Sequence, residues 1–259
     1  MNESLLAQRI SFAYPRQNIR GPEPAHVLRD VTLQVSPGES VALVGSSGSG
    51  KSTLLRIMLA LARPSAGTVS LGARAVVPGR ASGLRWYRRD VQYIPQNPAG
   101  SLDPRMRVSQ LLAEPLRQLK VPGDHTLLIR QVLERVEVPA ELLDRRPGDL
   151  SGGQNQRVAI ARALVVSPKF LLADEPVSGL DLPLRNAVIS LLDSLVRREG
   201  LGLVLVTHDL SMAAAMCGQT SVLSHGQVVE HGPTRQILGK PVHQATAALV
   251  QASTAAIAH

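Results

Sequence analysis

Residues 45–53 read Gly45-Ser-Ser-Gly-Ser-Gly-Lys-Ser-Thr53, and this stretch decides the fold because it matches G-x-x-x-x-G-K-S, the phosphate-binding loop pattern. The segments on either side agree with it. A short, β-rich apolar run from Glu39 to Val44 precedes the loop. The residues after it, Ser52 to Ala62, are helix-like, and their apolar face comprises Leu54, Leu55, Met58 and Leu61. Strand, loop and helix in this order predict a phosphate site and disfavour a simple glycine turn.

The chemistry of the loop follows from its residue types. Glycines let the backbone curl so that successive N–H groups point at phosphate oxygens, and the helix N-terminus adds the positive end of its dipole. We expect the Lys51 ammonium to reach the β- and γ-phosphates and the Ser52 hydroxyl to bind Mg²⁺. The stretch therefore predicts a binding site for a nucleoside triphosphate.

Composition is that of an ordinary globular protein. The chain has 259 residues, of which 44% are hydrophobic and 19% charged, so it can bury a sizeable core in one large domain or two small ones. No run approaches the roughly 18 apolar residues of a membrane span, and the N-terminus lacks the layout of a signal peptide. Cys217 is the single cysteine. We expect it to be a small buried hydrophobe in a reducing cytosol rather than a reactive thiol.

The formal charge of +8 leaves three interpretations open, namely nucleic acid, an anionic membrane surface, or simply arginine-rich usage. The densest patch, Arg85 to Asp90, mixes aromatic residues and an acid with its arginines instead of forming a long basic run. We interpret it as a solvated surface with a possible role in binding a partner, and we disfavour nucleic acid.

The order of the elements predicts an α/β fold. A polar loop, Pro15 to His26, follows the first strand, and a block of helical periodicity from Arg105 to Arg146 interrupts the strand-containing parts. Besides the run before the phosphate loop, the strand candidates are Leu5 to Tyr14, Val27 to Val35, Gly67 to Leu71, Val91 to Pro95, Phe170 to Asp174, Leu203 to Thr207, Thr220 to Ser224 and Val228 to Glu230. Strands that alternate with helices favour a largely parallel sheet.

Two further strand ends carry chemistry. The apolar run Phe170-Leu-Leu-Ala-Asp-Glu175 ends in two carboxylates: Asp174, expected near Mg²⁺ through water, and Glu175, expected to orient or deprotonate the attacking water. His208 ends the next apolar strand in the same way, where neighbouring strand tips converge. An isolated acid pair is usually a solvated strand end, and a lone histidine is usually structural. Here the apolar strands and Lys51 favour a catalytic pair and a γ-phosphate contact.

A second turn of glycines precedes a helix at Leu150-Ser-Gly-Gly-Gln154. The helix that follows has Val158, Ala161, Leu164 and Val165 on one side. A helix N-terminus of this kind is another ready-made anion site. One chain with two separate phosphate-binding turns suggests that two chains meet over a shared nucleotide.

Taken together, these motifs make the chain resemble the ATP-binding cassette (ABC) ATPase family over essentially its full length. The resemblance rests on six motifs in family order: Gly45–Thr53 (Walker A), Gln96 (Q-loop), Leu150–Gln154 (signature), Phe170–Glu175 (Walker B), Ser178–Asp181 (D-loop) and His208 (H-loop). It implies a P-loop NTPase (RecA-like) ABC ATPase core with an inserted helical subdomain and an N-terminal antiparallel β region. We expect one ABC ATPase domain over residues 1–259, with the nucleotide-binding core at 1–96 and 151–240, the helical subdomain at 97–150 and a C-terminal tail at 241–259.

The resemblance also implies roles for residues, with ATP and Mg²⁺ as the ligands. Tyr14 is expected to stack on adenine, with Phe12 as the fallback, and Asp181 to link two sites in a head-to-tail pair of cassettes. Nucleotide is expected to contact Gly45, Ser46, Ser47, Gly48, Ser49, Gly50, Lys51, Ser52 and Thr53 in one subunit, and Ser151, Gly152, Gly153 and Gln154 of the other. The expected catalytic residues are Glu175, His208 and Gln96, and the expected Mg²⁺ ligands are Ser52, Gln96 and Asp174.

Within the family, the segments Arg88–Pro98, Ser101–Arg105, Leu111–Leu116 and Glu175–Leu182 are similar to the dipeptide/oligopeptide/nickel importer branch, and most similar to the second ATPase subunit of nickel importers. Asp103 stands where that branch usually has Asn. The implied partners are transmembrane permease subunits, a second ABC ATPase, identical or different, and indirectly an extracytoplasmic solute-binding protein. The implied location is the cytoplasmic face of the cell membrane, as a peripheral subunit.

Other functions stay open beside the importer ATPase. A soluble ABC ATPase of DNA repair normally separates its halves by a long coiled coil, and one of translation carries two cassettes, whereas an exporter ATPase is often fused to membrane helices. The sequence contains none of these features, so we favour the importer subunit.

Overall fold

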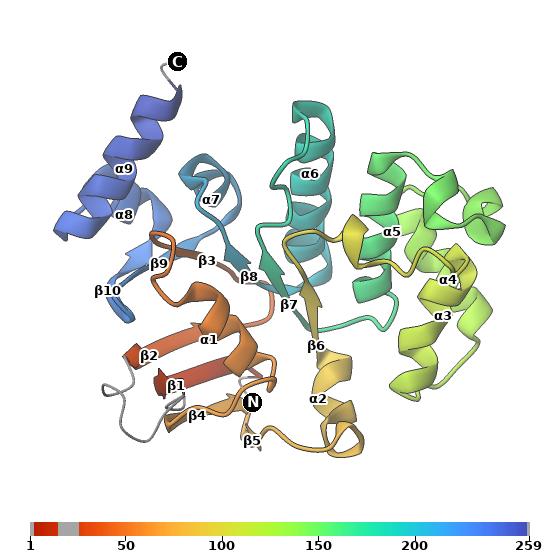
Figure 1. The fold of residues 1–259 in the computed structure, drawn as a ribbon, viewed down its shortest axis with the longest axis horizontal. Helices are drawn as coiled ribbons and strands as arrows, with labels where there is room; N and C mark the ends of the chain where they lie inside the picture. Colours follow the sequence, from red (N-terminus) through yellow and green to blue (C-terminus); the bar gives the residue numbers. More distant parts are fainter. Residues whose placement is uncertain (1–2, 15–25, 258–259) are drawn as a thin grey trace. The chain divides into compact units, whose positions relative to one another are not determined.

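The computed structural model describes residues 3–14 and 26–257 (Figure 1). The chain divides into two compact units, of which the first comprises Met1–Gly79 and Gly202–His259 and the second Arg80–Leu201. Apart from His26, the loop predicted from Pro15 to His26 lies outside the described residues.

The first unit contains a four-stranded antiparallel sheet in the order β2-β1-β4-β5. Its strands are β1 (Leu5–Ala13), β2 (His26–Val35), β4 (Ala66–Leu71) and β5 (Arg74–Val76). Side chains alternate between core and solvent along β2, as expected for a sheet with one wet face. The predicted N-terminal antiparallel β region is thereby confirmed, and the short strand β5 was missed.

The same unit holds a second set of strands in the order β10-β9-β3-β8. These strands are β3 (Ser40–Val44), β8 (Gly202–Val206), β9 (Gln219–Ser224) and β10 (Gln227–Pro233). β3 is parallel to both β8 and β9, whereas β10 returns antiparallel to β9. All residues of β3 and β8 are buried, which explains their continuous apolar sequences.

The helices of the first unit are α1 (Lys51–Met58), α7 (Leu210–Met216), α8 (Thr234–Gly239) and α9 (Gln244–Ile257). α1 follows β3 directly through the predicted phosphate loop (Figure 1). It is shorter than predicted. Its last turn closes at Arg56, whose carbonyl accepts the N–H groups of Leu61 and Ala62, and Ala60 adopts a left-handed φ of 54°. The prediction that Leu61 belongs to the apolar face was wrong, because the chain has left the helix and the side chain is 64% exposed.

The second unit pairs two parallel strands, β6 (Val91–Ile94) and β7 (Phe170–Asp174). Its helices are α2 (Arg85–Asp90), α3 (Val108–Gln118), α4 (His125–Arg135), α5 (Gly152–Leu164) and α6 (Leu182–Glu199). Short 3-10 turns lie at Ala81–Leu84, Ala99–Ser101, Ala140–Asp144 and Pro147–Asp149. α3, α4 and α5 pack on one another, so the predicted helical block is present.

The arginine-rich patch, interpreted as a solvated surface, is only partly exposed. It forms α2, and its Tyr87 is only 1% exposed. The Arg89 guanidinium donates to the carbonyls of Leu119 and Lys120 at the end of α3. Burial was the feature that charge counting could not predict.

Two other predictions can be compared with the structure. Cys217 is buried, and burial raises the pKa of its thiol to about 12, so it is the inert small side chain that was expected. No helix of the described part of the chain is long and apolar enough to cross a membrane.

Candidate functional site

The phosphate loop is built at the carboxyl end of β3 and is held by the β9–β10 hairpin. The Gly226 N–H donates to the Ser49 carbonyl at 3.1 Å, and the Ser49 N–H donates to the Ser46 carbonyl at 3.2 Å. Gly45 has a φ of 156°, and a Cβ there would lie 2.2 Å from the Leu223 carbonyl oxygen. Glycine is required at this position because the backbone of the neighbouring strand leaves no room for a side chain.

The loop enters α1 through Gly50, whose φ is 110°. A Cβ on Gly50 would lie 2.7 Å from the Leu28 side chain and 2.9 Å from the Val27 carbonyl oxygen. No side chain caps the N-terminus of this helix. Because the first-turn N–H groups of a helix have no carbonyl one turn earlier, they suit an anionic acceptor such as phosphate.

Lys51 directs its ammonium group back over the loop. Nζ donates to the Gly45 carbonyl at 2.7 Å and to the Ser46 carbonyl at 2.9 Å. Ser49 is 3% exposed, and its hydroxyl has no hydrogen-bond partner among the described residues. A buried hydroxyl is normally satisfied, so the loop has the polar character expected of one that a bound phosphate completes.

His208 follows β8, the parallel neighbour of β3, so it lies at the same edge of these strands as the phosphate loop. Its side chain is exposed. Tyr14 directly follows β1, is 51% exposed and packs edge-on against Phe12 with ring centroids 5.1 Å apart. An exposed ring backed by a second ring presents an open face for stacking.

In the second unit, two of the predicted catalytic residues are in contact. Gln96 lies just beyond β6 and Glu175 just beyond β7, and the Gln96 Nε2 donates to the Glu175 Oε2 at 3.1 Å. Asp174 is the last residue of β7. Glu175 has a left-handed φ of 46°, a conformation that costs a non-glycine residue energy and concentrates at functional sites.

The signature turn has a different construction. Ser151 caps α5, since its Oγ accepts the Gln154 N–H at 3.2 Å while the Gln154 Oε1 accepts the Ser151 N–H at 2.9 Å. This reciprocal pair uses the acceptor atoms of both side chains. The Ser151 hydroxyl proton and the Gln154 amide protons remain as donors, and donors are what an anion requires.

The predicted D-loop residue is also a cap. Asp181 precedes α6, and its carboxylate accepts the Leu184 N–H at 3.0 Å. A Cβ on Gly153 would lie 3.3 Å from the Leu184 side chain. Gly153 of the signature turn therefore lies against Leu184 at the start of α6.

One buried polar contact beside Glu175 was not predicted from the sequence. Gln156 on α5 is 2% exposed, and its Nε2 donates to the Pro176 carbonyl at 2.7 Å, directly after Glu175. The sequence does contain a signal for this contact, because Gln156 precedes Ile160 and Leu164 at the four-residue spacing of the buried face of the helix. A polar residue in an apolar stripe needs a buried partner.

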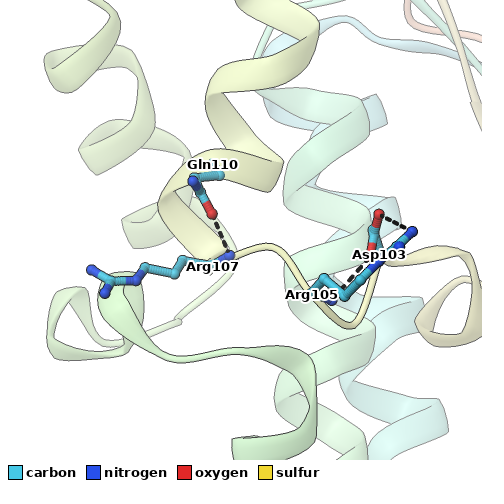
Figure 2. Close-up of polar contacts among 4 residues, drawn as sticks. All are labelled: Asp103, Arg105, Arg107 and Gln110. Atoms are coloured by element: carbon cyan, nitrogen blue, oxygen red, sulfur yellow. Dashed lines mark hydrogen bonds and ion pairs between the residues drawn. The ribbon is translucent and has the colours of Figure 1, made fainter.

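The segment after Gln96 is closed by local contacts of its own side chains (Figure 2). The Asp103 carboxylate accepts the Arg105 N–H at 2.9 Å and pairs with its guanidinium at 3.3 Å. The Gln110 Oε1 accepts the Arg107 N–H at 2.8 Å at the start of α3. The side chains of Arg105 and Arg107 are 89% and 54% exposed.

The residues proposed for Mg²⁺ fit that ion by chemistry. Ser52, Gln96 and Asp174 offer a hydroxyl, an amide carbonyl and a carboxylate, and hard cations prefer oxygen ligands. No group of three or more His, Cys, Asp or Glu residues that could hold a metal lies among residues 3–14 and 26–257.

A buried parallel strand that ends in a phosphate loop, followed by a helix entered through glycine, defines a phosphate-loop nucleotide-binding protein. The family model described as ABC transporter matches residues 28–178. The chain belongs to the ABC transporter family, and its fold is the ABC ATPase cassette. The predicted family and fold class are confirmed.

Known proteins of similar sequence and structure agree with this family and fold. The chain is 40% identical over 236 residues to the nickel import ATP-binding protein NikE of Rhodospirillum rubrum, covering 90% of this chain and 85% of that protein. It is 38% identical over 228 residues to a putative peptide import ATP-binding protein of Brucella ovis, covering 87% and 72%. A solved dimer of the cassette MJ0796 in a post-hydrolysis state with ADP and Pi superposes with a TM-score of 0.75 at 30% identity, covering 90% of this chain and 99% of that one.

Proposed function

We propose that this chain is the ATP-hydrolysing, energy-coupling subunit of a membrane ABC importer for nickel or for dipeptides and oligopeptides. The observation that carries the proposal is the contact of Gln96 with Glu175 at 3.1 Å beside the strand end at Asp174, in a chain with an intact phosphate loop. The relatives named as nickel and peptide import ATP-binding proteins support the importer class.

In the proposed mechanism the loop Gly45–Thr53 binds the triphosphate through its N–H groups and Lys51, and Tyr14 stacks on adenine. Bound Mg²⁺ would neutralise phosphate charge, and Ser52, Gln96 and Asp174 would hold it. Glu175 accepts a proton from the attacking water. Gln96 orients both that water and the Glu175 carboxylate. His208 donates to the γ-phosphate as negative charge develops there.

A pair of ATPase subunits completes the proposed site. The donors of Ser151, Gly152, Gly153 and Gln154 would bind the γ-phosphate held by the other subunit, and Asp181 would link the two sites. We propose that the partners are permease subunits, a second ABC ATPase and, indirectly, an extracytoplasmic solute-binding protein. The place of action is the cytoplasmic face of the membrane.

The segment from Gln96 through Arg107, with the helical subdomain at 97–150, is the proposed docking surface for the permease. Arg105 is the residue to probe, because its side chain is 89% exposed. Ser101 is less suitable, because its hydroxyl and carbonyl both accept hydrogen bonds from Arg162. A cysteine at Arg105 should crosslink to a permease subunit in an assembled, active complex, and a cysteine at exposed Lys240 should not.

The test of the function is copurification followed by ATPase assay. The tagged chain should bring down a membrane permease, and the reconstituted complex should hydrolyse ATP faster with either Ni²⁺ or a peptide presented by the solute-binding protein. Copurification with DNA-repair or ribosomal proteins and no permease would favour a soluble ABC ATPase. Hydrolysis stimulated by a substrate presented from the cytoplasmic side would favour an exporter.

A further inference from the structure

Arg162 is half-buried and makes a contact that none of the proposed roles uses. It lies on α5, the helix that begins at the signature turn. Its Nη1 donates to the Ser101 carbonyl at 2.8 Å and its Nη2 to the Ser101 hydroxyl oxygen at 2.7 Å. The Ser101 hydroxyl in turn donates to the Pro98 carbonyl. One guanidinium therefore closes the turn that follows Gln96.

The surroundings make this contact specific for arginine. Burial lowers the pKa of the Arg162 guanidinium, and the Glu114 carboxylate acts in the opposite direction. Arginine nevertheless stays charged. A charge that is partly withdrawn from water is stabilised by hydrogen bonds. The planar guanidinium fork reaches two oxygens of one residue, whereas a lysine ammonium acts as a single point.

The same helix holds the other half of the catalytic contact. Gln156 of α5 donates to the Pro176 carbonyl directly after Glu175. Arg162 of α5 bonds Ser101, which lies on the same segment as Gln96 and follows the turn at Pro98. The Gln96 Nε2 and the Glu175 Oε2 are 3.1 Å apart. α5 is thus the common support for both members of the pair.

We propose that Arg162 is a positioning residue that fixes Gln96 against Glu175 through Ser101. The inference rests on the proposed function. Misplacement of a positioned group by about 1 Å can cost on the order of 100-fold in rate. Because Arg162→Lys keeps the charge and loses the fork, we expect kcat for ATP to fall about tenfold. KM for ATP should change less than about twofold, because the phosphate loop is untouched.

The experiment is a double-mutant cycle in the full-length chain with Arg162→Lys, Ser101→Ala and both together. Ser101→Ala removes one of the two acceptors and should lower kcat about threefold. The double variant should be no slower than Arg162→Lys, because both changes break one contact. Arg197→Lys is the matched control, since Arg197 pairs with Asp193 on an exposed face of α6 at 2.7 Å. It should leave kcat within twofold.

Hydrogen exchange gives a readout that does not depend on turnover. Amides of residues 97–102 should exchange faster in Arg162→Lys than in the wild type, and those of the phosphate loop should not. Wild-type kcat in Arg162→Lys, a change confined to KM, or effects that multiply in the double variant would overturn the proposal. If Arg162→Lys does not fold, an unchanged kcat in Ser101→Ala would overturn it. A wild-type chain without ATPase activity would instead refute the proposed function, and exchange at residues 97–102 would still decide whether Arg162 orders the turn.

Discussion

Helix α1 begins after Gly50 and helix α5 begins after Ser151, and both starts were predicted from sequence to bind phosphate. They differ in how the first-turn N–H groups are satisfied. α1 has no side-chain cap and is entered through a glycine with a φ of 110°. α5 carries a complete capping box between Ser151 and Gln154. The first helix start therefore has no side-chain cap, whereas the second is capped by its own side chains.

This difference suits the two proposed roles. A site that binds nucleotide within its own subunit can use that nucleotide as a hydrogen-bond acceptor. A site that meets nucleotide only when two subunits close must keep its shape while they are apart. The predictions below test whether the two turns depend on ligand and side chains to the different degrees that their construction implies.

The largest effect is expected at the first turn. Lys51→Ala removes the ammonium that now bonds the Gly45 and Ser46 carbonyls and that is proposed to contact the β- and γ-phosphates. Charge-assisted hydrogen bonds are the strong ones, so the Kd for ATP should rise at least about 100-fold in calorimetric titration. Exposed Lys240 provides the control, Lys240→Ala. Unchanged ATP affinity in Lys51→Ala would contradict the assignment of the loop.

Glu175→Gln should separate binding from hydrolysis. The amide oxygen can still accept from Gln96, but the carboxylate that takes a proton from water is lost. A positioned general base contributes about 10²–10⁴-fold, so turnover should fall by that factor while ATP still binds. ATP and Mg²⁺ should then trap a closed pair of ATPases, which light scattering detects.

Glu141→Gln, at an exposed glutamate, is the matched control for Glu175→Gln. Near-normal hydrolysis by Glu175→Gln would contradict its role as the base. Loss of ATP binding together with hydrolysis would indicate a structural role instead. If the pair is heteromeric, both acidic residues have to be changed to see full closure.

The sequence predicted the motifs well because each one is short and local. Strand, glycine turn and helix are neighbours along the chain at residues 40–58, and their spacing alone specifies the loop. Contacts between distant segments carry no such local pattern. Nothing near Gln96 indicates that Arg162 bonds Ser101, and Gln156 reaches Pro176 across 20 residues of chain. The end of α1 was mispredicted because apolar residues continue at helical spacing past Met58, whereas the backbone turns left-handed at Ala60.

Glycine-to-alanine substitution should destabilise the first turn but not the second. Gly50→Ala forces a Cβ to within 2.7 Å of the Leu28 side chain at a φ of 110°, and backbone strain alone costs about 1–3 kcal/mol. Gly152 has nothing within 4 Å of an added Cβ, and alanine is the better helix former. The urea midpoint should fall in Gly50→Ala and stay or rise slightly in Gly152→Ala. Equal losses would show that the two turns are equally strained.

A smaller effect is expected when the cap of the second turn is removed. Ser151→Ala should lower the free energy of unfolding by about 1 kcal/mol, a fall of roughly 2–4 °C in Tm for a chain of this size. Asp124→Ala is the matched control, because Asp124 caps α4 through the Thr126 and Leu127 N–H groups. Both variants should lose similar stability. Only Ser151→Ala should weaken ATP-driven pairing of subunits, and pairing losses that are the same in both would remove the signature turn from the interface.

The smallest effect lies in the turn after Gln96, where Asp103 accepts the Arg105 N–H and pairs with its guanidinium (Figure 2). These contacts, the backbone hydrogen bond first, lower the pKa of the Asp103 carboxyl. A carboxyl whose pKa is lowered by folding stabilises the fold above its unfolded value, about 3.9, and loses that contribution as pH falls through the folded value. Asp103→Asn keeps a side-chain oxygen that can accept the Arg105 N–H and loses only the charge.

The Tm of the wild type should therefore exceed that of Asp103→Asn slightly at pH 7, and the difference should shrink as pH falls below about 3.9 and through the lowered folded pKa. Since the pair is exposed, added salt should reduce the difference at neutral pH. A difference that grows as pH falls would mean that the protonated carboxyl is the favoured form. A large difference at every pH would mean that the turn depends on charge rather than on its backbone hydrogen bond. This turn would then depend on a charged side chain, as the phosphate loop is expected to, and would differ from the turn at Ser151, which is held by its own capping hydrogen bonds.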